Sequence, residues 1–267
     1  MNHFTNQSNG SYRGHSLMGR AMLRRFALFF PMILLMLLLL PARMVAQTEA
    51  SSSKYIATFD SDTETLTFEK YEGESLPGDS ESEWVEDGKS VFEMFGSSYL
   101  RDIKHIVINE SFKTFTPTTL SCFFAALSEL ETITGLEYLN TANVTDMSLL
   151  FNNCQKLTSL DVTHFNTAKV TNMAFMFQDC NKLSSLDLSN FNTAKVTDMS
   201  YMFYGCSTLQ TIYVSDDFVV TGITNDNYKK NLFTICQALK GALPAYDATK
   251  TSSDYANYKT GYFTKLV

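Results

Sequence analysis

From residue 120 onward, hydrophobic and polar positions recur with a period of 26 residues. Three consecutive blocks align without a gap and occupy residues 144–169, 170–195 and 196–221. The first two of these blocks are identical at 15 of 26 positions. A degenerate unit at 120–143 precedes them, and Phe233, Cys236 and Leu239 continue the spacing after them. Self-similarity at a fixed period of this length predicts a solenoid, in which each unit buries its apolar face against its neighbours.

The first half of each block has the period of a helix. In the central block, apolar residues recur at steps of three and four, at Val170, Met173, Phe177, Cys180 and Leu183. This spacing places them on one face of a helix that faces the core. The segment ends in residues that tolerate a left-handed backbone, as a helix terminus often requires: Asn153, Asp179 and Gly205. The pattern therefore predicts one short helix per repeat.

The second half of each block follows an L-x-x-L-x-L pattern, which is typical of a short strand. The pattern appears as Leu157, Leu160 and Val162, as Leu183, Leu186 and Leu188, and as Leu209, Ile212 and Val214. A strand in every repeat predicts parallel strands stacked about 4.8 Å apart, with the helices on the opposite side.

The repeated motif VTDMSxMFxxCxxLxxLDLSNFNTAK strongly resembles the BspA-type leucine-rich repeats of bacterial surface proteins. The resemblance is close over 120–240, and looser over 55–112 and over the final YANYKTGYFT. It implies an exported, surface-associated binding or adhesion protein. The expected fold is an α/β solenoid, a leucine-rich-repeat-like right-handed coil array of short parallel strands and short helices. An N-terminal β cap and an irregular C-terminal cap would close its two ends.

The segments that flank the repeats are predicted to be caps, because the end coils of an array expose apolar faces. YIATF (55–59) and TLTFEK (65–70) alternate like the two strands of a hairpin. We divide the chain into a signal peptide with an extended n-region (1–46), a β-rich cap with an acidic loop (47–119), the repeats (120–240) and a C-terminal capping segment (241–267).

The N-terminal region has the parts of a secretory signal. Fifteen nearly uninterrupted apolar residues, Phe26–Leu40, follow Arg20, Arg24 and Arg25, and a short stretch ending at Ala46 follows them. A transmembrane anchor is the alternative, but the run is shorter than the roughly 20 residues that a spanning helix needs. We therefore expect cleavage after Ala46 and no integral membrane segment in the processed protein.

Removing the leader makes the chain strongly acidic. The full chain has a formal charge of −7, and residues 1–46 contain five arginines and no acidic residue. Without them, 16 basic and 28 acidic side chains remain, and Arg101 is the only arginine left. This balance argues against a partner that is bound through its phosphates, so we predict no nucleic-acid ligand.

The titratable residues do not form a familiar catalytic or metal-binding motif. Cys154, Cys180, Cys206 and Cys236 share one register, but thiols along a line suit neither a tetrahedral zinc site nor a disulfide, so we interpret them as small core residues. A disulfide remains the alternative, because an exported protein can be oxidised. Asp161 and Asp187 could form a glycosidase-like pair, but we prefer to interpret them as solvated carboxylates on regular strand positions. We expect no catalytic residue, metal or cofactor, and no enzymatic activity.

The outward side of the predicted strands is the best candidate for a partner site. Side chains alternate along a strand, so residues between the inward leucines point outward. The candidate residues are Ser159, Asp161 and Thr163, Ser185, Asp187 and Ser189, and Thr211, Tyr213 and Ser215. Tyr213 is the strongest of them, because aromatic residues are enriched among interface anchors.

The sequence therefore predicts an exported binding or adhesion protein, at the cell surface or secreted, with a periplasmic location as the alternative. Its repeats would recognise a protein or glycan partner on host or bacterial surfaces. A structural or accessory envelope protein without a discrete ligand is the other hypothesis.

Overall fold

The computed structural model describes residues 54–78, 81–243 and 245–266, and these lie in the unit Ser52–Val267. The predicted signal peptide falls outside the described residues, so its cleavage stays a prediction. The strands and the α-helix are β1 (Lys54–Asp60), β2 (Thr65–Tyr71), β3 (Ser82–Trp84), α3 (Val91–Tyr99), β4 (His105–Ile108), β5 (Thr132–Thr134), β6 (Ser185–Leu188), β7 (Thr211–Val214) and β8 (Phe263–Lys265). Short 3₁₀ helices occupy Glu110–Thr114, Leu136–Tyr138, Asp226–Lys229 and Ser253–Tyr255.

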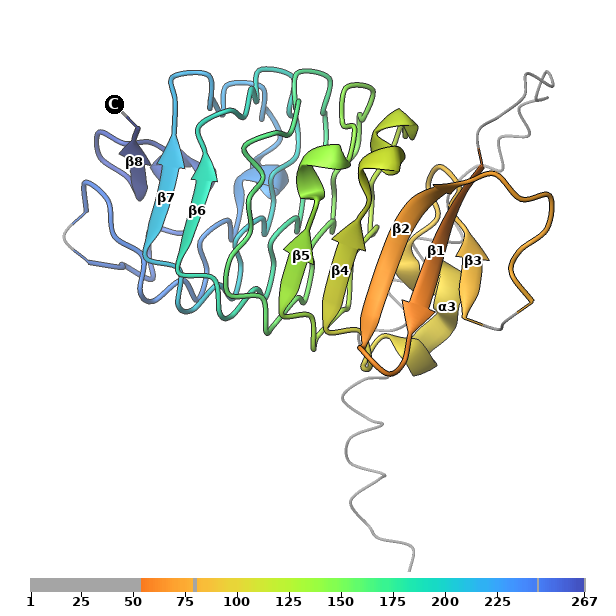
Figure 1. Cartoon of the computed structure of the whole chain (residues 1–267). Helices are drawn as coiled ribbons and strands as arrows, with labels where there is room; N and C mark the ends of the chain where they lie inside the picture. The colour runs from red at the N-terminus through yellow and green to blue at the C-terminus, as the bar shows by residue number, and fades with distance from the viewer. Residues whose placement is uncertain (1–53, 79–80, 244, 267) are drawn as a thin grey trace, which may run out of the picture. The chain divides into compact units, whose positions relative to one another are not determined.

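The first sheet is mixed and has five strands in the order β3-β1-β2-β4-β5 (Figure 1). β1 and β2 form the antiparallel hairpin that the sequence predicts, with Asp60 paired to Thr65. The Asp60 carboxylate accepts hydrogen bonds from the backbone N–H groups of Asp62 and Thr63 in the turn. From β2 onward the pairing is parallel, to β4 and then to β5. The hairpin therefore lies between β3, which pairs antiparallel with β1, and the parallel strands β4 and β5.

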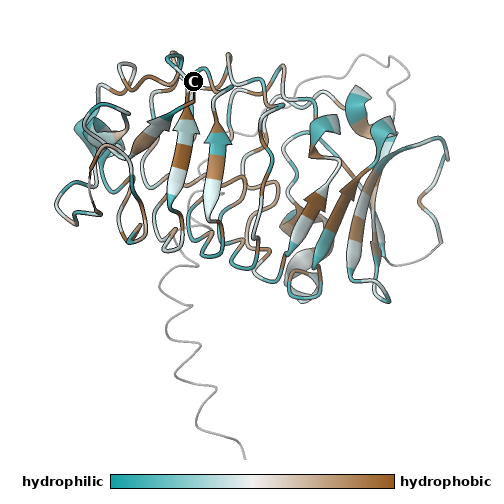
Figure 2. Cartoon of the chain, turned by 60° about the vertical axis from the view of Figure 1, so that its left-hand side comes forward, coloured by the Kyte–Doolittle hydropathy of each residue, from teal (hydrophilic) through white to brown (hydrophobic). Residues whose placement is uncertain are grey.

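The second sheet is parallel and has the order β6-β7-β8. β6 and β7 belong to consecutive repeats, and Ser185 pairs with Thr211 exactly 26 residues later. β8 comes from the C-terminal segment and pairs Phe263 with Ile212. Apolar and polar bands alternate along these strands (Figure 2), as expected for strands with one buried face. Leu186 and Ile212 face inward and are buried.

The repeats stack in register through backbone hydrogen bonds in their first halves. Alternate N–H groups donate to the next repeat: Met173 to Asp198, Phe175 to Ser200, Phe177 to Met202 and Asp179 to Tyr204, at 2.8–2.9 Å. Between them, Met176 and Gln178 donate to the carbonyls three residues back along the chain, and Ala174 donates to the Asn172 side chain. The same alternation occurs between the earlier repeats. We call residues 120–240, which contain these contacts, the repeat stack.

This alternation leaves no α-helix in the first halves of the repeats, because every second N–H group that an α-helix would use binds the neighbouring repeat. Two residues in the first half of each repeat also have a positive φ, as Phe175 (61°) and Asp179 (58°) do in the central repeat. A left-handed residue costs roughly 1–2 kcal/mol and interrupts a right-handed helix. The sequence correctly places left-handed residues at Asn153, Asp179 and Gly205, but they end turns rather than helices.

The predicted α/β leucine-rich-repeat-like coil array is therefore wrong. Among the described residues, α3 is the only α-helix, and it precedes the repeats. The strands do not form one parallel array either, since a mixed sheet and a parallel sheet are separate. Between β5 and β6, the predicted strand at 157–162 is irregular. The C-terminal segment is also more regular than predicted, because it supplies β8. The predicted boundaries at 119 and 240 stay predictions.

The interior of the repeat stack is a continuous apolar core, as the stripe from Val170 to Leu183 predicts. All five residues of that stripe have no exposed surface. Phenylalanine rings from successive repeats lie nearly parallel, with centroids 5.9 Å apart for Phe151 and Phe177 and 5.7 Å apart for Phe177 and Phe203. The ladder continues to Phe124 at one end and Phe233 at the other. One aromatic ring per repeat therefore links the cores of neighbouring repeats.

Candidate functional site

Two of the three predicted binding strands lie side by side. Asp187 on β6 pairs with Tyr213 on β7. Two residues earlier on the same strands, Ser185 pairs with Thr211, so both pairs point to the same side of the sheet. Ser185 is exposed, and Asp187, Thr211 and Tyr213 are half-buried. Parallel pairing holds neighbouring strands about 4.7–4.9 Å apart, so these side chains are close neighbours.

The third predicted strand is absent, so Ser159, Asp161 and Thr163 do not extend this pairing. The Asp161 carboxylate accepts hydrogen bonds from the Thr163 hydroxyl at 2.6 Å and the Thr163 backbone N–H at 3.0 Å. These two bonds lower the pKa of Asp161. In this irregular segment Leu160 is only half-buried, whereas Leu186 in β6 is buried.

β8 supplies the neighbour that the sequence interpretation missed. Thr264 pairs with Tyr213, on the side of β7 opposite to Asp187. The outward row on this sheet is therefore Asp187, Tyr213 and Thr264, which we call the strand-face row. The C-terminal segment does not follow the 26-residue period, so periodicity could not assign Thr264 to this position. The alternation in YFTK was the only signal for a strand there.

An ion pair attaches β8 to the end of β7. Lys265 Nζ lies 2.8 Å from Asp216 Oδ2, and the Tyr258 hydroxyl donates to Asp216 Oδ1 at 2.6 Å. Hydrogen bonds from Lys265 and Tyr258 lower the pKa of Asp216. Lys265 Nζ also lies 5.0 Å from the centroid of the Tyr258 ring. These exposed contacts position β8, and with it Thr264, beside Tyr213.

The strand-face row makes few bonds to the rest of the protein. Asp187 Oδ1 accepts a hydrogen bond from the Ser189 backbone N–H at 2.9 Å. At the end of β7, Ser215 Oγ accepts a long hydrogen bond, 3.4 Å, from the Asp217 N–H. The Tyr213 hydroxyl and the Thr264 hydroxyl form no hydrogen bond with any described residue. Most of the donors and acceptors of the row therefore remain available to a ligand.

The polar residues of the FNTAKVT run, by contrast, have structural roles. Thr167 Oγ1 accepts from the Asn192 N–H at 2.8 Å and donates to the Asn192 carbonyl at 3.0 Å. Thr171 donates both its N–H and its hydroxyl to the Thr145 carbonyl of the preceding repeat. Asn192 Oδ1 accepts from the Ala194 N–H, as an Asx turn requires. The FNTAKVT run therefore holds the repeats together, and polar residues outside this run are the better candidates for binding.

The cysteines line the core as the small buried residues that we expected. All five cysteines are free thiols, and the four that recur in the repeats are buried. Each of these donates its Sγ–H to a carbonyl of the preceding repeat, as Cys180 does to Phe151 at 3.2 Å. Burial raises the pKa of Cys154 to about 12. These cysteines are therefore protonated core residues rather than nucleophiles.

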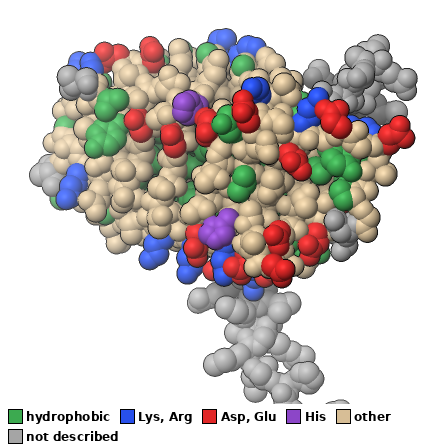
Figure 3. Space-filling view, in the orientation of Figure 1, with side chains coloured by type: hydrophobic (Ala, Val, Ile, Leu, Met, Phe, Trp, Pro, Cys, Tyr) green, Lys and Arg blue, Asp and Glu red, His purple; other side chains and the backbone are tan. Residues whose placement is uncertain are grey.

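The remaining titratable residues do not converge in the part of the chain that the structure describes. His105 Nδ1 lies 2.9 Å from the Thr132 hydroxyl, while His164 is exposed in a turn. No group of three or more His, Cys, Asp or Glu side chains there could hold a metal ion. Acidic side chains lie across the strand side, and basic side chains are found mainly near its edges (Figure 3).

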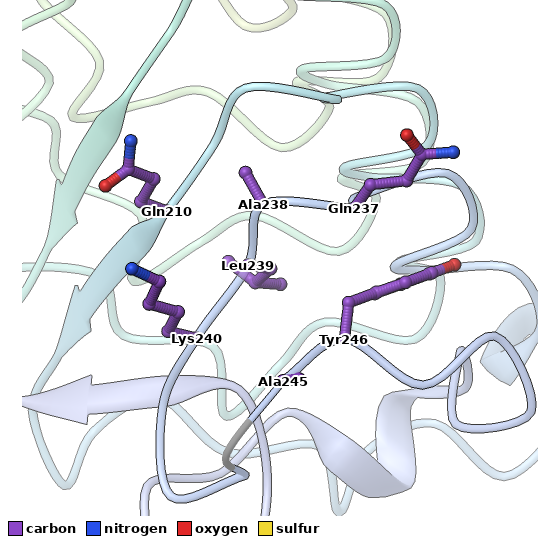
Figure 4. Close-up of a pocket in the computed structure, with 7 residues that line it drawn as sticks. All are labelled: Gln210, Gln237, Ala238, Leu239, Lys240, Ala245 and Tyr246. Atoms are coloured by element: carbon purple, nitrogen blue, oxygen red, sulfur yellow. The ribbon is translucent and has the colours of Figure 1, made fainter.

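An open pocket of about 250 Å³ lies beside the start of β7. Gln210 and Lys240 lie on one side of it, Gln237 and Tyr246 lie on the other, and Ala238, Leu239 and Ala245 complete the lining (Figure 4). The Tyr246 hydroxyl accepts a hydrogen bond from the Ile235 N–H. The pocket therefore offers two amides and one ammonium group next to the strand that carries Tyr213.

Within the described ranges, none of the helices has the length and apolar character needed to cross a bilayer. Neither the curated proteins nor the solved structures include a significant match to the chain. Residues 118–252, just over half of the 267 residues, match a family model described as "Mycoplasma protein of unknown function, DUF285". The matched region begins just before the first unit of the repeat stack and ends beyond its last. The chain with these stacked 26-residue repeats therefore belongs to the DUF285 family.

Proposed function

We propose that this chain is an exported cell-surface protein that binds a protein or glycan partner through the strand-face row. The observation that carries the proposal is the pairing of Asp187, Tyr213 and Thr264 on three hydrogen-bonded parallel strands. These residues do not belong to the polar set that holds the repeats together. Their functional groups are also largely without partners among the described residues.

The chemistry of the row suits a polar ligand with an apolar face. Asp187 offers an acceptor, Thr264 offers a hydroxyl, and the half-buried Tyr213 offers both a ring and a hydroxyl. The sheet already holds all three side chains, so a partner loses little conformational entropy in contacting them. Tyrosine is enriched among the residues that carry most of the binding energy at interfaces. The pocket beside Gln210 can accept a small polar group of the same partner.

Two features of the sequence support export and a surface location. A basic stretch followed by the apolar run Phe26–Leu40 is typical of a secretory signal. The repeats resemble those of BspA-type surface proteins, which is consistent with adhesion. We assign the chain a binding role without catalysis, in which the repeats act as a rigid support for the strand-face row.

Binding is tested with the full chain, applied to immobilised extracellular-matrix protein and to a glycan array. We expect Tyr213→Ala, and separately Asp187→Lys, to weaken retention by at least about tenfold, which corresponds to roughly 1.4 kcal/mol. Tyr213→Ala should act mainly by faster dissociation, and thermal stability should change little. The matched control is Lys169→Glu with Lys195→Glu, on exposed turns that lead away from the strand half of the repeat.

Two results would contradict the proposal. If the lysine variants abolish retention while the strand-face variants bind normally, the partner site lies elsewhere. If the wild-type chain binds none of these surfaces and is shielded from protease on intact cells, a structural envelope protein without a discrete ligand is the better description.

A further inference from the structure

A second cluster of aromatic residues lies in the turn half of the repeats, separate from the strand-face row. The rings of Phe175 and Tyr201 stack with centroids 4.9 Å apart and an interplanar angle of 6°. The Tyr204 ring lies 5.7 Å from Tyr201 and is tilted by 53°. All three side chains are half-buried. We call them the outer aromatic cluster, and the two tyrosine rings form an open corner within it.

The backbone does not require aromatic residues at these positions. Phe175 and Tyr201 have φ values of 61° and 59°, in the left-handed region that disfavours bulky side chains. The equivalent residue of the last repeat is Asn231, which has the same conformation with a φ of 60° and tolerates it better. The chain therefore places large rings where a smaller residue would serve the fold, and it leaves them partly in contact with solvent.

A carboxylate adjoins this cluster. The Asp179 N–H donates to the Tyr204 carbonyl at 2.8 Å, and Asp179 Oδ2 accepts from the Gln178 side-chain amide at 3.0 Å. Oδ1 lies over Gly205, where any side chain would collide with it. Asp179 is half-buried, and no ion pair between described residues includes it. Gly205 therefore makes room for a carboxylate that lacks a cationic partner.

Aromatic rings and a carboxylate together select a cation. The faces of aromatic rings attract ammonium and guanidinium groups, and a carboxylate adds a charge-assisted hydrogen bond. An apolar ligand would bury Asp179 further without a partner, and an anionic ligand would be repelled by it. Arginine satisfies both elements best, because its planar head stacks on rings while it pairs with a carboxylate.

We infer that the outer aromatic cluster and Asp179 form a docking site for an arginine- or lysine-bearing segment of a partner protein. The corner between Tyr201 and Tyr204 receives the cationic head group. Phe175 extends the apolar surface for the side chain's methylene groups. This site is distinct from the strand-face row, and neither site requires the other.

The site is tested by titrating an alternating Gly–Arg octapeptide into the full chain and measuring heat release at low salt. Tyr201→Asn copies the residue at 231, and Asp179→Asn copies Asn153, so both variants suit the left-handed backbone. We expect each to weaken peptide binding by about fivefold, as the loss of a cation–π contact or a charged hydrogen bond predicts. The matched controls, Tyr228→Asn and Asp217→Asn, remove an exposed tyrosine and an exposed carboxylate that belong to neither proposed site, and should leave the affinity within about twofold.

Three results would overturn the inference. The first is a failure of the wild-type chain to bind the peptide. The second is an equal loss of affinity in Asp217→Asn and Asp179→Asn, which would show that only the overall negative charge attracts the peptide. The third is unchanged binding by Asp179→Asn. This variant should keep the repeat backbone intact, so it tests the inference even if Tyr201→Asn does not fold.

Discussion

Two columns of side chains run along the repeat stack, one facing the core and one facing outward. Their residues are only two positions apart in the sequence, but they differ in burial and in how far the residue type recurs. The inner column is Phe151, Phe177 and Phe203, in which the same residue recurs and no surface is exposed. The outer column is Leu149, Phe175 and Tyr201, in which the residue changes in each repeat and the side chain is half-buried. Close packing restricts the inner residue, while the outer residue is free to change from one repeat to the next.

The threonines of the repeats show the same contrast with polar groups. Thr193 is fully buried, and its hydroxyl both donates to and accepts from the backbone of Val219 at 2.6 Å. Thr197 is exposed, and its hydroxyl only adds a second bond to a carbonyl that its own N–H already contacts. In both comparisons the two residues differ in burial. Substitution of the buried residue should therefore lower the stability more than substitution of its more exposed counterpart.

The largest effect is expected for a charge placed in the inner core. Cys180→Asp should leave the chain unfolded at neutral pH, because an unpaired buried carboxylate costs several kcal/mol. Cys180→Ala removes only the Sγ–H bond to Phe151 and a small volume, and should cost about 1 kcal/mol. Circular dichroism and urea denaturation of the two variants check this. A folded, stable Cys180→Asp protein would show that this column is not the core.

The next effect is the loss of one ring from the inner ladder. Phe177→Ala should lower the free energy of unfolding by about 3–5 kcal/mol, through lost burial and a cavity between Phe151 and Phe203. The matched control is Phe175→Ala, which removes the same atoms from the outer column and should cost only about 0.5–1.5 kcal/mol. Equal losses in the two variants, measured by urea denaturation, would remove the distinction between the columns.

A smaller effect is expected for the buried hydroxyl. Thr193→Val leaves the N–H and the carbonyl of Val219 without their buried partner, which should cost about 1–3 kcal/mol. Thr197→Val should cost less than about 0.5 kcal/mol, because the backbone bond to Thr171 remains and water replaces the hydroxyl. Thermal denaturation of the pair tests this order. A more harmful Thr197→Val would contradict it.

The smallest effect concerns the pH dependence of stability at Asp179. Burial raises the pKa of this carboxyl above its ordinary value of 3.8. The folded state therefore binds the proton more tightly than the unfolded state, and this residue's contribution to stability falls as pH rises through the raised pKa. Asp179→Asn removes that loss, so the variant should be slightly more stable than the wild type at pH 7. The difference should shrink toward pH 3.8, and a difference that is constant with pH would contradict this reasoning.

The sequence predicts burial in the repeats better than it predicts their backbone. Apolar steps of three and four correctly identify Phe177 and Cys180 as core residues. Consecutive turns stabilised by bonds to the third residue back produce the same spacing as a helix, so periodicity cannot separate the two. The left-handed Phe175 is the residue that decides between them, and nothing in its side chain indicates that conformation.

The candidate site was predictable only in part. The register of Asp187 against Tyr213 follows directly from the 26-residue period. The third predicted strand does not form: Asp161 bonds Thr163 in an irregular segment, although Asp187 makes the equivalent bond to Ser189 from within β6. Thr264 takes the place on the other side of Tyr213 from a segment with no repeat, so only the three-dimensional structure could reveal it.

The run FNTAKVT occurs twice in the repeat stack, at 165–171 and 191–197, exactly one repeat apart. Thr171 and Thr197 make the same hydrogen bonds to the preceding repeat, whereas Thr167 bonds the backbone of Asn192 and Thr193 bonds that of Val219. A recombination event between these two stretches of the gene would therefore gain or lose one whole unit while leaving the protein junction unchanged. A chain that gained or lost one unit in this way would have the same FNTAKVT junction as the present one. Selection can then act on the size of the surface that such variants present.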